Sequence, residues 1–316
     1  MRLQPTVLVF VVALLFLSAL AAAQNVDVTK IEACVLPPLE RAGNAVMVNI
    51  PQRTLDVTPD GTPVNVFEQD VQNEVCVADP AQFTIPPHAI EVQQDVFNLG
   101  TAVVDGKNVE GYVFVHHREF AKPPGAGNNK QSETCFVFLA KGAKWKTVEP
   151  WLGNPANTEG LNGAFVTDNL ATDIQKWENH ANVDILGAGT STAAMLIADT
   201  AAPDGLNEVY FSDISDPGAI AVTIVWGVFS GPPAQRELVE WDMVYDQIDF
   251  DWSGNGEAGT MDFENIATHE IGHAAGMSHP PDTCTEETMY RFADFGETKK
   301  RDLNAGDITG IQQLYA

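Results

Sequence analysis

The chain has 316 residues, with 43 acidic and 17 basic side chains, and its formal net charge is -26. Nucleic acids and anionic membrane surfaces repel a protein of this charge, so neither is expected as a partner. The length suits two folded domains.

The first 23 residues have the pattern of a cleaved secretory signal peptide. A lone Arg2 precedes an apolar run at residues 7–20, and Ala21, Ala22 and Ala23 supply a small-residue end. The apolar run is shorter than the ~20 residues that cross a bilayer. A retained anchor is the alternative. We expect a secreted, extracellular protein with no stable membrane anchor after signal cleavage.

Residues 24–140 contain short β-prone runs, such as residues 45–50 and 109–115, separated by Pro, Gly and Asp. The pattern predicts a small β-rich N-terminal domain or a propeptide. Residues 121–130 are rich in Pro, Gly and Asn and predict a linker that proteases reach. If the preceding segment covers the active site, cleavage in this linker would release a catalytic fragment.

The four cysteines are an even number in a chain with an export signal, which indicates two disulfides. Three pairings are open. We favour Cys34 with Cys76 and Cys135 with Cys284. The second bond would attach the loop after residue 279 to the start of the C-terminal domain.

Residues 141–316 are expected to mix strands and helices. A strand is predicted near residues 145–151. A helix is predicted over residues 161–180, where apolar side chains are spaced for one buried face. Further strands are expected at residues 183–186, 208–212, 220–229 and 238–245.

An acidic loop follows the last of these strands. Asp249, Asp251 and Glu257 place oxygen donors at intervals typical of calcium loops, which makes them a candidate Ca²⁺ site. Thr260 stands where an EF-hand requires Glu, so the loop is no EF-hand. A solvated turn is the alternative interpretation.

The most informative motif spans residues 269–279, HEIGHAAGMSH. On a helix capped by Asp262, His269 and His273 lie one turn apart on the same face, with Glu270 beside them. Gly276 permits the left-handed backbone that ends the helix and returns His279 as a third ligand.

Three neutral imidazoles leave one tetrahedral position on zinc for water, which is typical of a catalytic site. Glu270 is then the expected general base, because it is not needed as a ligand. The other histidines, His88, His116, His117 and His180, are expected to have ordinary surface or structural roles.

The extended motif, followed by Thr288, Met289 and Tyr290, resembles the metzincin metallopeptidases with their Met-turn. Residues 303–315 are similar to the closing helix of the matrixin branch, and residues 143–146 and 240–244 are weaker matches. The chain therefore resembles a matrixin-like secreted peptidase of the prokaryotic type.

The resemblance implies an α+β fold for a catalytic domain at residues 141–316, with a mixed twisted sheet, an active-site helix and a C-terminal helix. It implies one catalytic zinc, with Met289 as an apolar floor beneath the ligands. Substrate would lie along the outermost strand, for which residues 220–229 are a candidate; a buried strand is the equally weighted alternative. The family's inhibitory cysteine segment is absent, so residues 24–140 are not expected to act as a cysteine switch.

These features together predict a secreted zinc endopeptidase that acts on proteins or peptides. Two other classes stay open. One is an extracellular binding or adhesion protein whose degenerate peptidase domain keeps zinc for structure, although such a protein would have little reason to retain Glu270. The other is a binding protein whose N-terminal β domain recognises a target and whose peptidase acts as effector.

Overall fold

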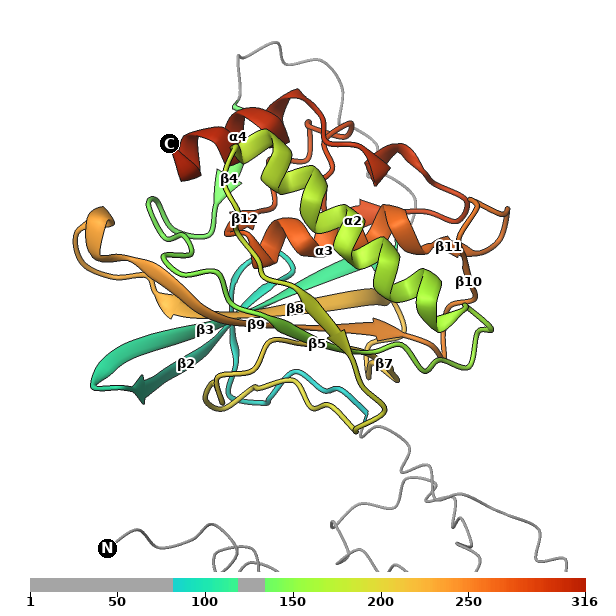
Figure 1. The fold of residues 1–316 in the computed structure, drawn as a ribbon, viewed down its shortest axis with the longest axis horizontal. Helices are drawn as coiled ribbons and strands as arrows, with labels where there is room; N and C mark the ends of the chain where they lie inside the picture. The colour runs from blue at the N-terminus through green and yellow to red at the C-terminus, as the bar shows by residue number, and fades with distance from the viewer. Residues whose placement is uncertain (1–81, 119–133) are drawn as a thin grey trace, which may run out of the picture. The chain divides into compact units, whose positions relative to one another are not determined.

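The computed structural model describes residues 82–118 and 134–316 (Figure 1). The expected signal peptide, the run at residues 45–50, Cys34, Cys76 and the linker at residues 121–130 lie outside the described residues. The strands are β1 Ile90–Gln93, β2 Val96–Val104, β3 Lys107–Arg118, β4 Val137–Phe138, β5 Trp151–Asn154, β6 Gly189–Ser191, β7 Glu208–Ser212, β8 Ala219–Val228, β9 Glu237–Asp246, β10 Trp252–Ser253, β11 Met261–Asp262, β12 Met277–Ser278 and β13 Phe292–Ala293. The helices are α2 Gly163–Ala181, α3 Phe263–Ala274 and α4 Ala305–Tyr315, with short 3-10 turns η2 Pro233–Gln235 and η3 Lys299–Arg301.

A nine-stranded mixed sheet forms the centre of the fold, with strand order β1-β2-β3-β8-β9-β7-β5-β6 and β13 paired to β3. Strands β5, β6, β7 and β9 pair in parallel, whereas β8 is antiparallel to both β3 and β9. The three helices lie on one face of this sheet (Figure 1). The expected α+β fold, with a mixed sheet and a C-terminal helix, is confirmed, and residues 269–273 lie on helix α3 as expected.

The core is divided between the two faces of the sheet. On the helix side, Trp177 of α2 and Phe263 of α3 are buried against Met243 and Tyr245 of β9. On the opposite side, alternate residues of β3 and β8, including Val113 and Trp226, pack in a second cluster. Because side chains alternate along a strand, each strand contributes to both clusters and fixes which residues face the helices.

The expected boundary at residue 140 does not separate the strands of the described fold. Strand β3, which was assigned to an N-terminal β domain, pairs with β8 from Glu110 opposite Gly227 to His117 opposite Ala219. The described residues, 82–118 and 134–316, accordingly belong to one compact unit. The pairing is long-range, so the local pattern that predicted a separate β domain could not show it.

The prediction that residues 220–229 form the outermost strand is wrong. Strand β8 lies between β3 and β9, and all but one of its ten residues are buried. The alternative interpretation, a buried strand, is the one observed, because β3 occupies the side that would otherwise be free.

Other predicted elements differ in their bounds. The helix expected over residues 161–180 is α2, and the strands expected at residues 208–212 and 238–245 are β7 and β9. The strand expected near residues 145–151 begins only at Trp151, and residues 183–186 are not a strand. The backbone N–H groups of Ile185 and Leu186 instead bind Oε1 of Glu178, at the end of α2.

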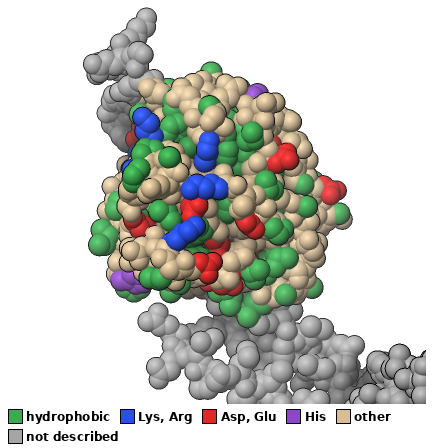
Figure 2. Space-filling view, turned by 60° about the vertical axis from the view of Figure 1, so that its left-hand side comes forward, with side chains coloured by type: hydrophobic (Ala, Val, Ile, Leu, Met, Phe, Trp, Pro, Cys, Tyr) green, Lys and Arg blue, Asp and Glu red, His purple; other side chains and the backbone are tan. Residues whose placement is uncertain are grey.

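Cys135 and Cys284 form a disulfide that joins positions 149 residues apart. This is one of the two pairs expected from the sequence, and it attaches the loop after α3 to the segment before β4. Among the described residues, no helix has the length and apolar character needed to span a bilayer. On the face drawn in Figure 2, Lys and Arg side chains lie among acidic and scattered hydrophobic ones.

Candidate metal centre

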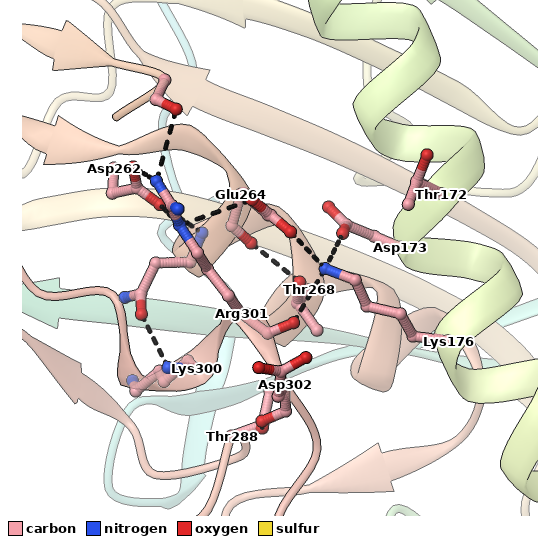
Figure 3. A network of polar contacts seen from close by, with 12 residues as sticks. Thr172, Asp173, Lys176, Asp262, Glu264, Thr268, Thr288, Lys300, Arg301 and Asp302 are labelled. Atoms are coloured by element: carbon pink, nitrogen blue, oxygen red, sulfur yellow. Dashed lines mark hydrogen bonds and ion pairs between the residues drawn. The ribbon is translucent and has the colours of Figure 1, made fainter. Parts of the chain in front are cut away.

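Helix α3 is held at its first turn by a cap and by charged side chains of two other elements. The carboxylate of Asp262 accepts a hydrogen bond from the backbone N–H of Asn265, which confirms the expected N-cap. Arg301 of η3 binds the same carboxylate with two donors. Lys176 of α2 donates to Glu264, 2.6 Å away, and to the carbonyl of Arg301 (Figure 3). These contacts fix the direction in which α3 runs across the face of the sheet (Figure 1).

The chain reverses after α3 and returns a third histidine to the helix. Gly276 has φ 101°, a left-handed conformation that favours glycine. A Cβ at this position would also lie 3.1 Å from the carbonyl oxygen of Ala143. The following residues, Met277 and Ser278, pair with β4 as strand β12 and lead directly into His279.

Three imidazoles converge at this point. Nε2 of His273 lies 3.1 Å from Nε2 of His269 and 3.1 Å from Nε2 of His279. Nδ1 of His269 is 2.7 Å from the carbonyl oxygen of Thr288, and Nδ1 of His273 is 3.0 Å from that of Met277. A carbonyl only accepts, so Nδ1 of both rings carries the proton and each Nε2 presents a lone pair toward the others.

This arrangement fits a zinc ion. Ligand nitrogens of a tetrahedral zinc site at about 2.0–2.1 Å from the ion are separated by roughly 3.3 Å, close to the spacing of the three Nε2 atoms. Burial lowers the pKa of His273 to about 3 and lowers the pKa of His269 and His279 well below the usual value, so all three are neutral. Lone pairs that face one another without a shared proton repel, and a cation between them removes that repulsion.

Met289 packs directly against the helix that carries His269 and His273. Its side chain is fully buried and packs against Gly272 of α3, where a Cβ would lie 2.2 Å from the Met289 sulfur and 2.6 Å from the Trp177 ring. The backbone N–H groups of Thr288 and Met289 both donate to the buried carboxylate of Asp307 in α4, at 2.7 and 3.2 Å. The closing helix therefore positions the turn from which the carbonyl of Thr288 orients His269.

Glu270 lies next to the imidazoles with both carboxylate oxygens engaged. Oε2 accepts a hydrogen bond from the hydroxyl of Thr223 in β8 at 2.6 Å, and Oε1 is 3.0 Å from Nδ1 of His116 in β3. Burial raises the pKa of Glu270 to about 8, while the Thr223 hydroxyl and the charge of Lys300 act in the opposite direction. A carboxyl of this kind can exchange a proton near neutral pH.

His116 belongs to this centre, although the sequence predicted an ordinary role for it. Its ring stacks on His269, with centroids 3.8 Å apart, and its Nε2 is 2.9 Å from Nζ of Lys300. Nζ of Lys300 also donates to the carbonyl oxygens of Tyr290 and Phe292, so an ammonium there gives its third hydrogen to Nε2 of His116, and Nδ1 of His116 then donates to the ionised form of Glu270. The adjacent His117 faces the other side and approaches Asp95 and Asp216 instead. The sequence predicted that the two adjacent histidines point to opposite sides of the strand. It could not predict which of the two sides contains Glu270.

The expected calcium loop is not assembled as predicted. Of its three residues, Asp249 lies near Asp213 and Asp246, while Asp251 and Glu257 join no metal-like cluster among the described residues. The carboxylate of Asp246 accepts from the backbone N–H groups of Ile248 and Asp249, which closes the loop as a hydrogen-bonded turn. The turn was the alternative interpretation of this segment.

Comparison with known proteins gives matches to part of the chain. The model of the matrixin family matches residues 231–316. Metalloendoproteinase 1-MMP of Arabidopsis thaliana is 36% identical over 69 residues, which are 22% of this chain and 18% of that protein. Matrilysin of Homo sapiens is 38% identical over 64 residues, which are 20% of this chain and 23% of that protein. The matches thus span about a fifth of the length of these relatives.

Proposed function

We propose that this chain, whose C-terminal part is a matrixin-like metzincin metallopeptidase domain, is a secreted zinc endopeptidase. The observation that carries the proposal is the convergence of three buried, neutral Nε2 atoms beside the carboxylate of Glu270. A closed structural zinc site takes a fourth protein ligand, whereas a catalytic site takes three and leaves one position open. The pattern at the N-terminus supports export.

In this proposal, different residues bind the metal and transfer the proton during peptide hydrolysis. His269, His273 and His279 would hold the ion, and the carbonyl of Thr288 keeps His269 oriented toward it. When bound there, zinc polarises the scissile carbonyl and increases the acidity of water. Glu270 takes a proton at its carboxylate and returns it to the leaving amine, so no covalent intermediate with the protein is needed.

The segment after Met289 would supply one wall of the substrate pocket. Strand β13 pairs with the end of β3, where Phe292 lies opposite His117, and the ring of Tyr290 packs edge-on against that of Phe292, with centroids 5.7 Å apart. An apolar side chain of the substrate, next to the cleaved bond, would be placed between this wall and α3. The alternative of a binding protein with a degenerate domain is not favoured, because Glu270 is retained without being needed as a ligand.

The test uses purified full-length protein and removes the metal reversibly. Zinc content is measured by atomic emission, before dialysis against 1,10-phenanthroline and after zinc is restored. Cleavage of a peptide library is followed by mass spectrometry in the same samples. We expect one zinc per chain and slow endoproteolytic cleavage, whose products disappear and return with the metal. Products that persist without zinc would contradict the proposal.

A further inference from the structure

The candidate metal centre is closed in this structure. His269, His273 and Glu270 have no exposed surface, and His279 is 1% exposed. An endopeptidase must admit an extended polypeptide to its metal, so the element that covers the centre has to give way before catalysis. That element is β3, because both Phe114 and His116 contact the metal-binding residues directly.

The backbone of β3 occupies a slot between two strands. It pairs antiparallel with β8 along eight residues of register, and its end pairs in parallel with β13, where Phe292 stands opposite His117. Strand β8 has β9 on its other side, so it would be an edge of the sheet without β3. A free edge presents unpaired N–H and C=O groups that an extended peptide can bind by adding a strand.

The side chains of β3 fill the cleft as those of a bound peptide would. Because residues alternate along a strand, Tyr112, Phe114 and His116 all point to the helix side. The ring of Phe114 stacks on His273, with centroids 4.1 Å apart and an angle of 17° between planes. Val113 and Val115 point the other way, into the second core cluster. The strand is therefore held by the core on one face while its other face seals the metal centre.

His116 also contacts Glu270, the expected general base. Its Nδ1–H donates to Oε1 of Glu270, and Thr223 donates to Oε2, so both oxygens of the expected base are bonded within the protein. The covering strand thus contacts the expected base through a histidine, and this contact needs no cysteine.

We propose that β3 is an internal occupant of the peptide-binding cleft and keeps the enzyme latent until the strand is withdrawn from β8. This inference rests on the proposed function and adds its regulation. It places part of the segment 24–140 in the role of a propeptide that inhibits by strand pairing. The linker predicted at residues 121–130 follows β3 in the sequence, so a cut there would leave the occupant held to the rest of the catalytic domain only by non-covalent contacts.

The test weakens the pairing of β3 without touching the metal centre. A Cβ at Gly111 would lie 2.7 Å from the ring of Trp226 on β8, and the indole N–H of Trp226 is bonded to the carbonyl of Asp199. Gly111→Val should therefore displace β3. Val103→Ala is the matched control on the same hairpin, because the Val103 side chain is 70% exposed.

Full-length, zinc-loaded parent, Gly111→Val and Val103→Ala proteins are compared in two assays. One follows transfer of zinc to the chromophoric chelator 4-(2-pyridylazo)resorcinol. The other follows cleavage of a quenched fluorescent peptide. We expect both rates to rise at least about tenfold in Gly111→Val, because the open population grows as the pairing weakens. Val103→Ala should match the parent. Circular dichroism checks that every variant is folded at the assay temperature.

The outcomes separate this inference from the proposed function. Faster zinc transfer without any peptide cleavage supports the covering strand and contradicts the peptidase. Equal zinc transfer in folded Gly111→Val and in the parent overturns the inference, whatever the activity. If Gly111→Val does not fold, Phe114→Ala takes its place, since it removes the ring stacked on His273 and leaves the β3 backbone intact. Faster zinc transfer in Phe114→Ala than in the parent then supports the inference, and equal zinc transfer overturns it.

Discussion

Oε1 of Glu270 lies 3.0 Å from Nδ1 of His116, although 154 positions separate the two residues in the chain. The contact joins the expected general base to a strand that the sequence assigned to another domain. It exists because β3 and β8 pair in a register that places His116 opposite Ala221, two residues from Thr223, the other partner of Glu270. The position of the base thus depends on the sheet as well as on its own helix.

Asp307→Ala is expected to lower the free energy of unfolding by about 3–5 kcal/mol. The Asp307 carboxylate accepts from the backbone N–H groups of Thr288, Met289 and Asn304, and it is fully buried. Its removal leaves these donors without a partner and loosens the turn beneath His269. Urea unfolding measures the loss. Asp302→Ala, at an exposed position nearby, is the control and should change stability by no more than about 0.5 kcal/mol. Equal effects of the two substitutions would contradict this account of the turn.

Cys135→Ser combined with Cys284→Ser is expected to cost about 2–4 kcal/mol of unfolding free energy, because the bond restricts a long loop of the unfolded chain. A non-reduced digest analysed by mass spectrometry checks that the parent contains the linkage. The single variant Cys135→Ser should lose as much stability as the double variant, since either change breaks the same bond. Free thiols at both positions in exported protein would show that the bond does not form.

Stability is expected to fall as the pH rises through the range in which Glu240 ionises in the folded state. Burial raises its pKa from 4.5 to about 8, so the folded protein holds a proton that the unfolded chain has released. The protonated Glu240 therefore makes its full contribution to the free energy of unfolding below about pH 4.5. This contribution, on the order of 3 kcal/mol, is lost by about pH 8.

Glu240→Gln should flatten this dependence, because the amide does not ionise and can still accept from the backbone N–H of Gly205. Thermal or urea unfolding at pH 5, 6.5 and 8 provides the measurement. Glu286→Gln, which replaces a largely exposed carboxylate, serves as control and should keep the slope of the parent. A slope unchanged by Glu240→Gln would place the responsible proton elsewhere.

Local sequence patterns predicted the elements that depend on neighbours in the chain. The apolar spacing around Leu170 and Trp177 gave α2, and the Asp262 cap with the HExxH spacing gave α3. Gly276 was correctly assigned to the turn that returns His279, because only the left-handed backbone allows that reversal over three residues.

What the sequence could not predict depends on pairing between distant strands. The runs at residues 96–104 and 107–118 are β-prone by themselves, but nothing local shows that they extend the sheet of the C-terminal domain. For the same reason His116 was missed: two adjacent histidines in a strand face opposite sides, and only the partner strand decides which side contains Glu270. The calcium site predicted for the acidic loop was wrong because acidic side chains at alternate positions also occur in ordinary turns. Here the Asp246 carboxylate accepts hydrogen bonds from the backbone N–H groups of Ile248 and Asp249.

The most direct test of the central claim is the turnover of Glu270→Gln at full zinc occupancy. The parent, Glu270→Gln and Glu286→Gln are prepared with and without Gly111→Val, so that activity is compared in chains whose cleft is open. Glutamine keeps the shape of the side chain but cannot take up the proton. We predict one zinc per chain in every protein, and a cleavage rate reduced about 10²–10⁴-fold only where Glu270 is replaced. Cleavage at the parent rate by zinc-loaded Glu270→Gln would contradict the assignment of this centre as a peptidase site.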